Sequence, residues 1–537
     1  MKLRVLGLTG LVCALIANLA PMSAASAPDA RAWTEAATSG QLSLALAAHK
    51  NKVPAEFIER LAHVRPDGTL QVMVALTERD AAIEGFVADN TAWAKWYGDA
   101  PRFWGAATQD QVIALLDHQS VSFVEPDFKI SHFLSTSTVA AGARPGATST
   151  GVWSYDATGN ALRSELPQIT ADQATGKGVT VAITDSGIDR THLDFGGFNC
   201  TPAPYQPCQS RIRRAVTTEH MLGGSDLGDA TPTTEVASGH GTHVAGIVAG
   251  NAYYGRNAGA DTARYGGDGF NFGIAPQADL VSVKNGDTLW AGLSTMGLQW
   301  TLDNAQQYGI KVSNNSWGCV GGCSFNGASA LGQTFKDLYE AGVVVVFAAG
   351  NDGGSDNGAA LSGYAQSPYV LGVANYNDTD NKLASSSSRG AKADSTLHAP
   401  ATWTPTSEPV NGTRRPDVGA PGTSIWSART LTGGAASLIP RLWADDAGLG
   451  ATGFVPYVTM SGTSMAAPHV AGAAAVLFSA CVGAEALDVM RAIMAGANAA
   501  TIQKTTGSGI AEPFEVGYGA LNIRASLDWL GSQKGCI

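Results

Sequence analysis

The chain has 537 residues and a net charge of −11, with 45% hydrophobic and only 15% charged residues. This length exceeds that of one small domain, and the composition is that of a compact globular protein, not of a disordered one. Nucleic-acid binding needs a basic footprint, and the sequence has no run of Lys or Arg. We therefore expect no nucleic-acid partner.

The first 27 residues have the pattern of a secretory signal peptide. Lys2 and Arg4 give a positive start, Leu6–Ala20 is apolar, and small residues follow as far as Ala27. The alternative, a buried N-terminal helix, does not explain this order of charge, apolar core and small residues. We expect export to the extracellular space or the periplasm. No later segment is expected to have the unbroken apolar length of a membrane span, so no membrane partner is predicted.

Residues 28–134 are expected to form a small α+β domain. Thr69–Leu76 alternates like a strand, and Val121–Ile130 is predicted to form a second strand. Between them, Thr108–His118 opens on a helix-capping residue and carries an apolar stripe. Residues 135–160 follow as an exposed linker with Pro and Gly, of the kind that proteases cut.

From residue 161 to 537 the pattern changes to apolar strands that alternate with helical segments. Stretches such as GVTVAIT and GVVVVFA are apolar throughout. Strands of this kind, separated by helices, predict a mostly parallel sheet covered on both faces, and so a three-layer α/β domain. Ligands of such sheets bind where the carboxyl ends of the strands meet loops, and the polar motifs of this chain fall there.

The cysteines indicate disulfide bonds. Of the seven, Cys13 leaves with the signal peptide, and an even number in an exported chain favours disulfides. Cys200 and Cys208 form one local pair, Cys319 and Cys323 form another, and Cys481 and Cys536 are left for each other. Six cysteines allow 15 connectivities, so local pairing is a preference. A metal site is disfavoured because matching ligands at zinc-finger spacing are missing.

Two polar motifs lie in the first part of the predicted sheet domain. Asp185 ends the strand of VTVAITDSG, where its carboxylate could orient an imidazole or merely form a turn. His240 of SGHGTHVAG lies near a helix start, between glycines that leave room for a substrate. His240 and His243 could instead bind a metal together, although no third ligand is evident nearby.

Two further motifs follow. Asn351 ends GVVVVFAAGN, where its amide could donate to an oxyanion or only begin a turn. Ser464 lies where SGTS turns into an Ala-rich helix, whose N-terminus offers free N–H groups and a positive dipole end. Pro468 is tolerable only in the first turn, so the helix should begin near Ser464. A plain serine N-cap is the alternative, but it does not explain the small residues around the serine.

The motifs AITDSGID, GHGTHVAG, AAGN and SGTSMAAPHVAG, in this order, resemble those of the subtilisin-like serine proteases, the subtilase family. The resemblance implies a secreted serine endopeptidase that works through an acyl-enzyme. It implies that Ser464 is the nucleophile, His240 the base and later the acid, and Asp185 the group that orients the imidazole. The side chain of Asn351 and the backbone N–H of Ser464 would form the oxyanion hole, and His243 would be structural.

The resemblance covers roughly Leu166–Leu530 and also implies substrate contacts. The substrate-binding residues that it implies are Ser316, Trp317, Gly318, Ala349, Gly350 and Gly363. The first three would pair with the substrate backbone, which gives affinity without strict sequence choice. Trp317 could equally be a plain core aromatic. The last three would line a pocket with room for large apolar side chains, so broad protein or peptide substrates are expected.

Residues 28–134 resemble the propeptide of the family, although this version is longer than usual. A propeptide of this kind assists folding and inhibits the active site until it is cleaved, so the chain would be an autoprocessed zymogen. The mature protein is expected to begin between about 133 and 155 and to be a monomer. A stably retained domain is the alternative.

No cofactor for catalysis is implied, but a structural calcium ion is. Asp194 of THLDF matches a calcium ligand of the family. The partner loop is replaced by the long insertion 251–273, so the metal ligands remain unknown. A solvated acidic surface accounts equally well for the aspartates there.

Two other functions stay open. The chain could be an inactive relative that serves as a binding module, although such a protein would be expected to have lost one of the four site residues. It could also be a dedicated processing enzyme that uses its insertions to recognise one partner protein.

Overall fold

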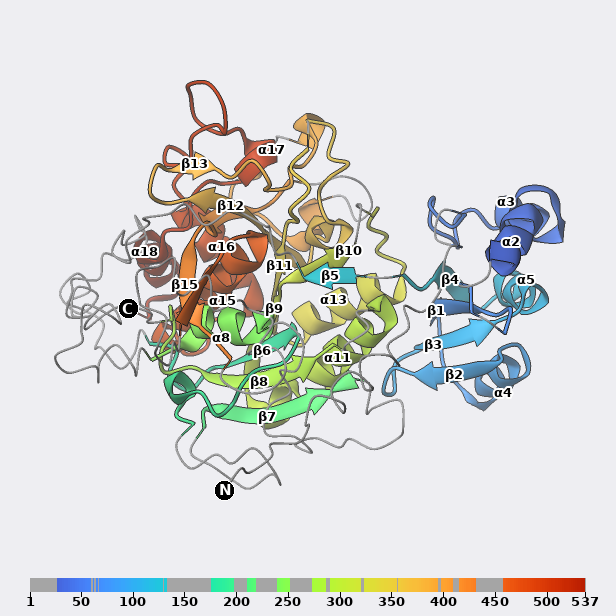
Figure 1. Cartoon of the computed structure of the whole chain (residues 1–537). Coiled ribbons are helices and arrows are strands. Elements are labelled where there is room, and N and C mark those ends of the chain that lie inside the picture. Colours follow the sequence, from blue (N-terminus) through green and yellow to red (C-terminus); the bar gives the residue numbers. More distant parts are fainter. Residues whose placement is uncertain are drawn as a thin grey trace, which may run out of the picture. The chain divides into compact units, whose positions relative to one another are not determined.

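The structure of the protein is a computed structural model, and it describes residues 27–58, 61, 64–65, 67–128, 130–132, 175–197, 210–218, 239–251, 273–285, 290–319, 323–354, 356–394, 397–408, 415–430 and 457–536. The chain divides into two compact units (Figure 1). The first holds the described residues up to Trp96 and Pro101–Asp127, and the second holds Tyr97–Ala100 and the described residues from Phe128 onward. The predicted signal sequence up to residue 26, the linker 135–160, Cys200 and Cys208 lie outside the described residues.

A four-stranded antiparallel sheet forms the centre of the first unit, in the order β2-β3-β1-β4. Its strands are β1 (Leu70–Leu76), β2 (Trp93–Trp96), β3 (Arg102–Ala107) and β4 (Val121–Pro126). Its helices are α2 (Ala27–Ser39), α3 (Gln41–Ala48), α4 (Ala81–Asp89) and α5 (Gln109–Asp117). The predicted helix begins where the sequence indicates because Thr108 and Gln111 form a capping box.

The predicted second strand is wrong in its extent. The prediction runs from Val121 to Ile130, but β4 ends at Pro126. Residues Ile130–His132 instead form β5, which pairs antiparallel with β10 (Trp317–Cys319) of the second unit, to which β5 itself belongs (Figure 1). A sequence pattern can indicate that a segment is extended, but it does not show which strand the segment will pair with.

An eight-stranded sheet forms the centre of the second unit, in the order β13-β12-β11-β9-β6-β8-β7, with β14 also paired to β12. The strands are β6 (Thr180–Asp185), β7 (Ile212–Thr217), β8 (Asp279–Lys284), β9 (Ile310–Asn315), β11 (Val344–Ala348), β12 (Val370–Asn377), β13 (Lys382–Leu383) and β14 (Val418–Pro421). Every pair is parallel except β12 with β13. A separate antiparallel pair joins β15 (Ile425–Ala428) to β16 (Tyr457–Met460).

Helices cover both faces of this sheet, which confirms the predicted three-layer α/β fold. They are α8 (His240–Ala249), α11 (Ala291–Asp303), α12 (Ala305–Tyr308), α13 (Ala330–Glu340), α15 (Thr463–Ala480), α16 (Ala486–Gly496), α17 (Pro513–Val516) and α18 (Ile523–Lys534). Strand β11 shows the two faces. Val344 and Val346 join the core around α8 and α15, while the ring of Phe347 lies 5.5 Å from that of Phe335 in α13.

Helix α15 runs through the core of the second unit beside α8 (Figure 1). Its small residues allow close packing, since a Cβ added at Gly472 would lie 2.5 Å from the Cβ of Ile274. Contrary to the sequence-based expectation, this helix is long and apolar enough to cross a membrane, but 94% of the window concerned is buried inside the protein. Its apolar character is therefore that of an interior helix.

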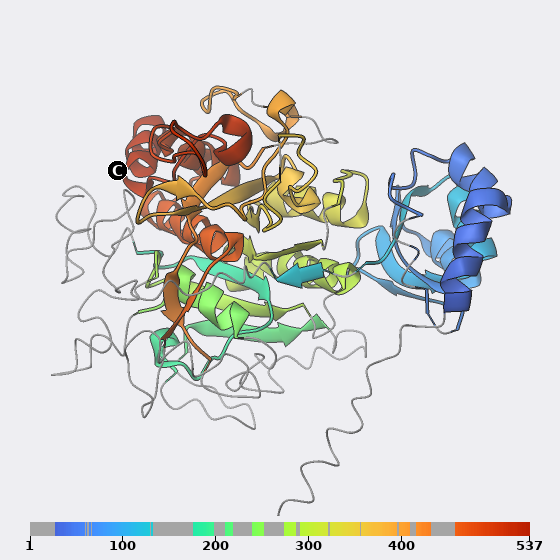
Figure 2. The same ribbon diagram turned by 45° about the horizontal axis from the view of Figure 1, so that its top comes forward.

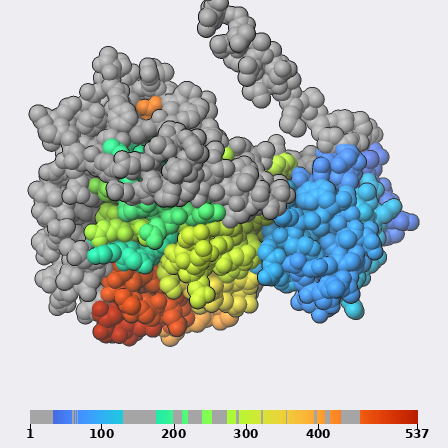
Figure 3. Space-filling model, turned by 90° about the horizontal axis from the view of Figure 1, so that it is seen from below, coloured from blue at the N-terminus to red at the C-terminus, as the bar shows by residue number. Residues whose placement is uncertain are grey.

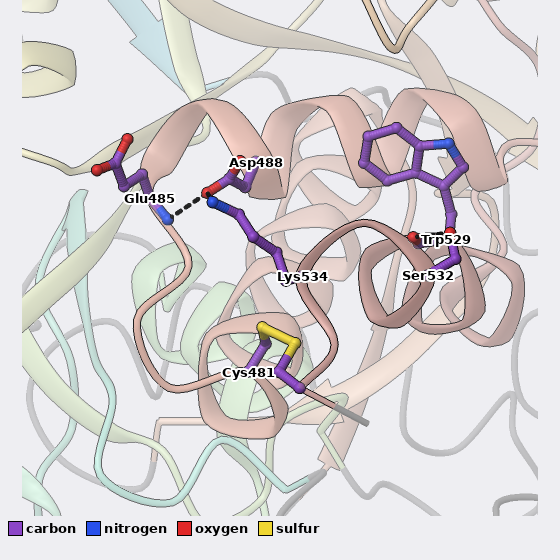
Figure 4. The surroundings of a disulfide bond; sticks show 7 residues. Cys481, Glu485, Asp488, Trp529, Ser532 and Lys534 are labelled. Carbon is purple, nitrogen blue, oxygen red and sulfur yellow. Dashed lines mark hydrogen bonds and ion pairs between the residues drawn. A yellow bond between two sulfur atoms is a disulfide. The ribbon is translucent and has the colours of Figure 1, made fainter.

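Two of the three predicted disulfides lie in the described residues, and both are formed. Cys319 pairs with Cys323, and Cys481 pairs with Cys536. Cys481 follows the end of α15 and Cys536 follows α18, so the second disulfide ties the C-terminal segment to the core helix (Figure 4).

An ion pair lies near this disulfide. Lys534 Nζ is 2.7 Å from Asp488 Oδ2, and the same oxygen accepts a hydrogen bond from the backbone N–H of Glu485 (Figure 4). The C-terminal residues, red in Figure 3, border the residues near 340, yellow, on one face of this unit. Tyr339 packs against the same core as α16 and α18.

Replacing Cys481 and Cys536 together by Ser should destabilise the second unit. The bridge spans a sequence separation of 55 residues, and closing a loop of this size stabilises a fold by roughly 2–4 kcal/mol. We expect a clear fall in the melting temperature, measured by circular dichroism. The pair Cys319→Ser and Cys323→Ser is the matched control, because its separation of 4 residues predicts a smaller fall. Equal falls for both pairs would contradict this reasoning.

Candidate active site

Asp185 and His240 meet at the carboxyl end of β6. Asp185 is the last residue of β6 and His240 the first of α8, and His240 Nδ1 lies 2.7 Å from Asp185 Oδ1. Both side chains are completely buried. An ionised carboxylate can only accept a hydrogen bond, so Nδ1 carries the ring proton and donates it. The other nitrogen, Nε2, is then the basic nitrogen of the neutral imidazole.

Glycines let α8 begin this close to β6. Gly239, the N-cap of α8, has a φ of +72°, a conformation that other residues rarely adopt. A Cβ on Gly241 would collide with the carbonyl of Gly187, and its backbone N–H donates to Ser186 Oγ over 2.9 Å. The glycines that the sequence places around His240 therefore bring the helix start against the strand end.

His243 has a different environment from His240. Its Nε2 donates to two backbone carbonyls, those of Ile425 in β15 and Val458 in β16, each at 3.0 Å. Burial is the main cause that lowers the pKa of His243 to about 3, and the proximity of His240 acts in the same direction. A neutral ring that holds two strands together is a structural element. The part of the chain that the structure describes contains no group of three or more His, Cys, Asp or Glu that could hold a metal ion.

Ser464 lies at the start of α15, which begins at Thr463 after Gly462 with a φ of +150°. Its hydroxyl donates to the backbone carbonyl of Ser316 over 2.9 Å. In return, the hydroxyl of Ser316 donates to the backbone carbonyl of Ser464 over 3.0 Å. The two serines are thus joined by a reciprocal pair of hydrogen bonds.

Pro468 explains one of these bonds and corrects a prediction. The sequence places Pro468 in the first helical turn, but α15 begins at Thr463, so Pro468 lies in the second turn. In an α-helix the carbonyl of Ser464 would accept from the N–H of residue 468, and proline has none. The hydroxyl of Ser316 supplies the missing donor.

Asn351 is held by the residue before Ser464. Its Oδ1 accepts two hydrogen bonds of 3.0 Å, from the backbone N–H and from the hydroxyl of Thr463. The N–H of Gly350 donates to the same hydroxyl over 3.2 Å. This fixes the amide so that Nδ2 points the other way. That nitrogen is buried and has no acceptor among the described residues, which costs about 1–3 kcal/mol for such a group.

The side chain and the backbone of Trp317 in β10 have different surroundings. The indole is fully buried, with edge-to-face contacts to Phe347 at 4.8 Å and Tyr364 at 5.4 Å, so its side chain is a core aromatic. Its backbone nevertheless lies in an edge strand, together with Gly318, and pairs with the antiparallel strand β5 (Figure 2).

Ala349, Gly350 and Gly363 lie together beyond the end of β11. The carbonyl of Ala349 accepts from the N–H of Ser362, 2.8 Å away, next to Gly363. Gly350 has a φ of +111°, and its carbonyl accepts from the N–H of Ser388 over 2.9 Å. Backbone hydrogen bonds therefore set the positions of these small residues.

The described surroundings of Asp194 contain a cation of the chain itself, the guanidinium of Arg211. The Oδ1 of Asp194 accepts from the hydroxyl of Tyr457 over 2.9 Å. The backbone carbonyls of Asp194, Ala249 and Ala278 all accept hydrogen bonds from the guanidinium of Arg211. These three backbone oxygens beside Asp194 are thus occupied by a guanidinium, whereas its carboxylate makes none of these bonds.

Arg211 keeps its charge in this buried place. Burial lowers its pKa to about 10, and Asp279 and Asp194 act in the opposite direction, so the guanidinium is charged at neutral pH. The partner insertion, residues 252–272, lies outside the described residues. A calcium ion therefore stays a prediction.

Two of these residues, Thr463 and Arg211, were not found in the sequence, and Ser316 was predicted only as a substrate contact. All three act through partners far away in the chain, so local patterns carry no sign of these contacts. The adjacency of Thr463 to Ser464 is the one hint that the sequence offers.

The comparisons with known proteins point in the same direction. The sequence profile of the subtilase family matches residues 176–519. A subtilisin-like protease of Coccidioides posadasii (strain C735) is 29% identical over 394 residues, which are 72% of this chain and 70% of that protein. Subtilisin amylosacchariticus of Bacillus subtilis subsp. amylosacchariticus is 29% identical over 321 residues, and the match spans 59% of each chain.

Among solved structures, fervidolysin from Fervidobacterium pennivorans, a keratinolytic enzyme related to subtilisin, has the same fold. The TM-score is 0.54 at 21% sequence identity, over 86% of this chain and 61% of that chain. The fold and the relatives define the class of the subtilisin-like serine endopeptidases, which are hydrolases. The chain belongs to the subtilase family.

The buried His243 should make the protein less stable in acid. Its pKa is about 3 in the folded state and near 6.5 when unfolded, so below pH 6.5 only the unfolded state binds the proton. The free energy of unfolding should then fall by about 1.4 kcal/mol per pH unit from this group, between pH 6.5 and about 3. His243→Gln should remove that slope in urea unfolding measured from pH 6 to 4.

A matched control is His398→Gln, since His398 is partly exposed. This variant should keep the wild-type slope. If His243→Gln kept it as well, the proton would not be bound at His243.

Proposed function

We propose that the chain is the precursor of a secreted serine endopeptidase in which Asp185, His240 and Ser464 form the catalytic triad. The observation that carries the proposal is the buried amide of Asn351, fixed by the residue next to Ser464 and without an acceptor for its Nδ2 among the described residues. An N–H group that is buried without an acceptor can donate to an oxygen of the substrate that becomes negative during the reaction.

The attack begins at Ser464. In the resting state its hydroxyl donates to the carbonyl of Ser316. Rotation about the Cα–Cβ bond turns it toward Nε2 of His240, which accepts the proton as the oxygen attacks the scissile carbonyl carbon. Asp185 accepts from Nδ1 and stabilises the imidazolium that forms.

The negative oxygen of the tetrahedral intermediate is stabilised at the start of α15. The backbone N–H of Ser464 belongs to the first residues of the helix and has no partner within it. Together with Asn351 Nδ2 it offers two donors, and the positive end of the helix dipole adds to them.

The remaining steps use the same residues. The imidazolium of His240 gives its proton to the leaving amine, and the acyl group stays on Ser464. A water molecule, deprotonated by the same imidazole, then attacks the acyl-enzyme and releases the acid.

Substrates would bind as an extra strand on β10. Antiparallel pairing engages backbone atoms of any sequence, which suits broad protein and peptide substrates. The existing pairing of Trp317–Cys319 with β5 supports this role, because it has the geometry that a bound peptide would have. Ala349, Gly350 and Gly363 would receive the side chain at the scissile bond.

The N-terminal part of the chain would act as signal peptide and propeptide. Residues 1–27 would direct export, and residues 28–134 would fold as a chaperone-like inhibitor. The pairing of β5 with β10 supports inhibition, because β5 occupies the edge that substrates need. Phe128 adds to this attachment, since its carbonyl accepts from the N–H of Ala291 and its ring stacks on that of Tyr364.

The position of the cleavage follows from the same pairing. His132 lies opposite Trp317, the neighbour of Ser316, to which Ser464 is bonded. We therefore place self-cleavage between about 133 and 155, and we expect the mature enzyme to be a monomer.

Ser464→Ala should abolish proteolysis and self-processing while the fold survives. We expect no cleavage of casein, no labelling by a fluorophosphonate, and a secreted chain whose N-terminus still lies near residue 28. The wild-type protein should be labelled and should begin between about 133 and 155, as read by N-terminal sequencing. Cleavage of casein by the purified variant would refute the assignment of the nucleophile. A digest of casein that stops at one site would instead favour a dedicated processing enzyme.

Asn351→Ala should lower kcat by about 10²–10³, the range typical for one oxyanion donor in a subtilisin, with little change in KM. Thr463→Val keeps Asn351 but removes a hydroxyl that fixes its amide. We expect a smaller loss, again in kcat, because the amide can then rotate. The measurement is steady-state kinetics on a peptide substrate. A Thr463→Val enzyme with lower kcat than Asn351→Ala would contradict this ranking.

A further inference from the structure

The Cys319–Cys323 disulfide lies where two segments meet that the proposed function assigns to the substrate. Cys319 is the last residue of β10 and is buried, whereas Cys323 is partly exposed. The bond joins their sulfur atoms and holds the two Cα atoms 6.0 Å apart. It therefore ties the end of the edge strand to the segment that begins at Cys323.

Gly363 connects this segment to the second group of substrate residues. A Cβ added at Gly363 would lie 2.5 Å from the carbonyl oxygen of Cys323 and 2.7 Å from its sulfur. Real Cβ atoms do not come so close to other atoms. The backbone of Gly363 does not have a positive φ, so its conformation would allow a side chain. Lack of space, not backbone conformation, therefore excludes a side chain here.

The other end of β10 is held without the disulfide. Ser316 is bonded to Ser464 in both directions, and the ring of Trp317 is packed between Phe347 and Tyr364. At the Cys319 end, the disulfide and the pairing with Ile130 of β5 tie the strand to other segments, and Cys319 is also buried. Under the proposed function β5 departs with the propeptide, which leaves the disulfide as the covalent restraint on that end.

We propose that the Cys319–Cys323 disulfide is a positioning element that determines which side chain the enzyme accepts at the scissile bond. It presses the Cys323 segment against Gly363 and so sets the distance between that glycine and the end of β10. Cys319 and Cys323 are positioning residues, since neither contacts the reacting atoms. The inference rests on the proposed function of the same site.

The first test replaces both cysteines by Ser in the mature enzyme. Peptides that differ only in the residue on the acyl side of the scissile bond, Phe against Ala, report selectivity as a ratio of kcat/KM. Changes of pocket shape of this kind alter selectivity by about tenfold. We expect the Phe-to-Ala ratio to fall by about that factor. Labelling by a small fluorophosphonate reports separately whether Ser464 still reacts in the variant.

The matched control replaces Cys481 and Cys536 by Ser, which removes a disulfide at the far end of α15. Assayed well below its melting temperature, this variant should keep the wild-type ratio. An equal change in both double variants would show that the ratio follows general stability, and it would overturn the inference.

Gly363→Ala supplies a second, independent test that leaves the disulfide intact. The added methyl group should push the Cys323 segment away and change the Phe-to-Ala ratio by itself. Combined with Cys319→Ser and Cys323→Ser, the same substitution should have a smaller effect, because the segment is then free to move. Additive effects in this double-mutant cycle would show that the disulfide does not act through Gly363.

The outcomes separate this inference from the proposed function. If the wild-type enzyme neither hydrolyses the peptides nor reacts with the fluorophosphonate, the proposed function itself is wrong. If every variant reacts with the fluorophosphonate and all keep one selectivity ratio, the enzyme assignment stands and only the role of the disulfide is refuted.

Discussion

The two hydrogen bonds between Ser316 and Ser464 are the constraint on which the rest of the site depends. They join the beginning of the edge strand β10 to the beginning of α15, two segments separated by 148 positions in the chain. One of them exists because Pro468 leaves a helical carbonyl without its usual donor. The hydrogen bond that is missing within the helix is thus replaced by one to a residue far away in the chain. The same helix start presents Thr463 to Asn351, so strand, helix and amide take their positions together.

The sequence predicts the elements of the fold better than the contacts between them. Uniformly apolar runs such as β11 identify buried parallel strands, because a strand covered on both faces has no polar side. The sequence could place Asp185 and His240 at the same edge of the sheet, since one ends a strand and the other begins a helix. The orientation of the Asn351 amide and the true place of Pro468 could not be predicted, because both depend on partners that only the folded chain brings close. For the same reason, the residues of Val121–Ile130 could not reveal that β5 pairs with β10.

Arg211 places a positive charge beside the motif that suggests a calcium ion. THLDF alone suggests a calcium ligand, but the sequence does not show that a guanidinium reaches three carbonyls beside it. Burial lowers the pKa of this arginine, and the charge survives because that pKa, about 10, stays well above neutral pH.

The place of β5 has a consequence for how such an enzyme would be controlled. A peptide that covers the substrate edge of its own chain is made in a ratio of one to one with that edge, whatever the level of synthesis. Raising or lowering expression could then never change the balance between enzyme and blocker. Only degradation of the released peptide would change this ratio. The fraction of the protease that is active would then be set by the degradation of the peptide and not by the rate of synthesis.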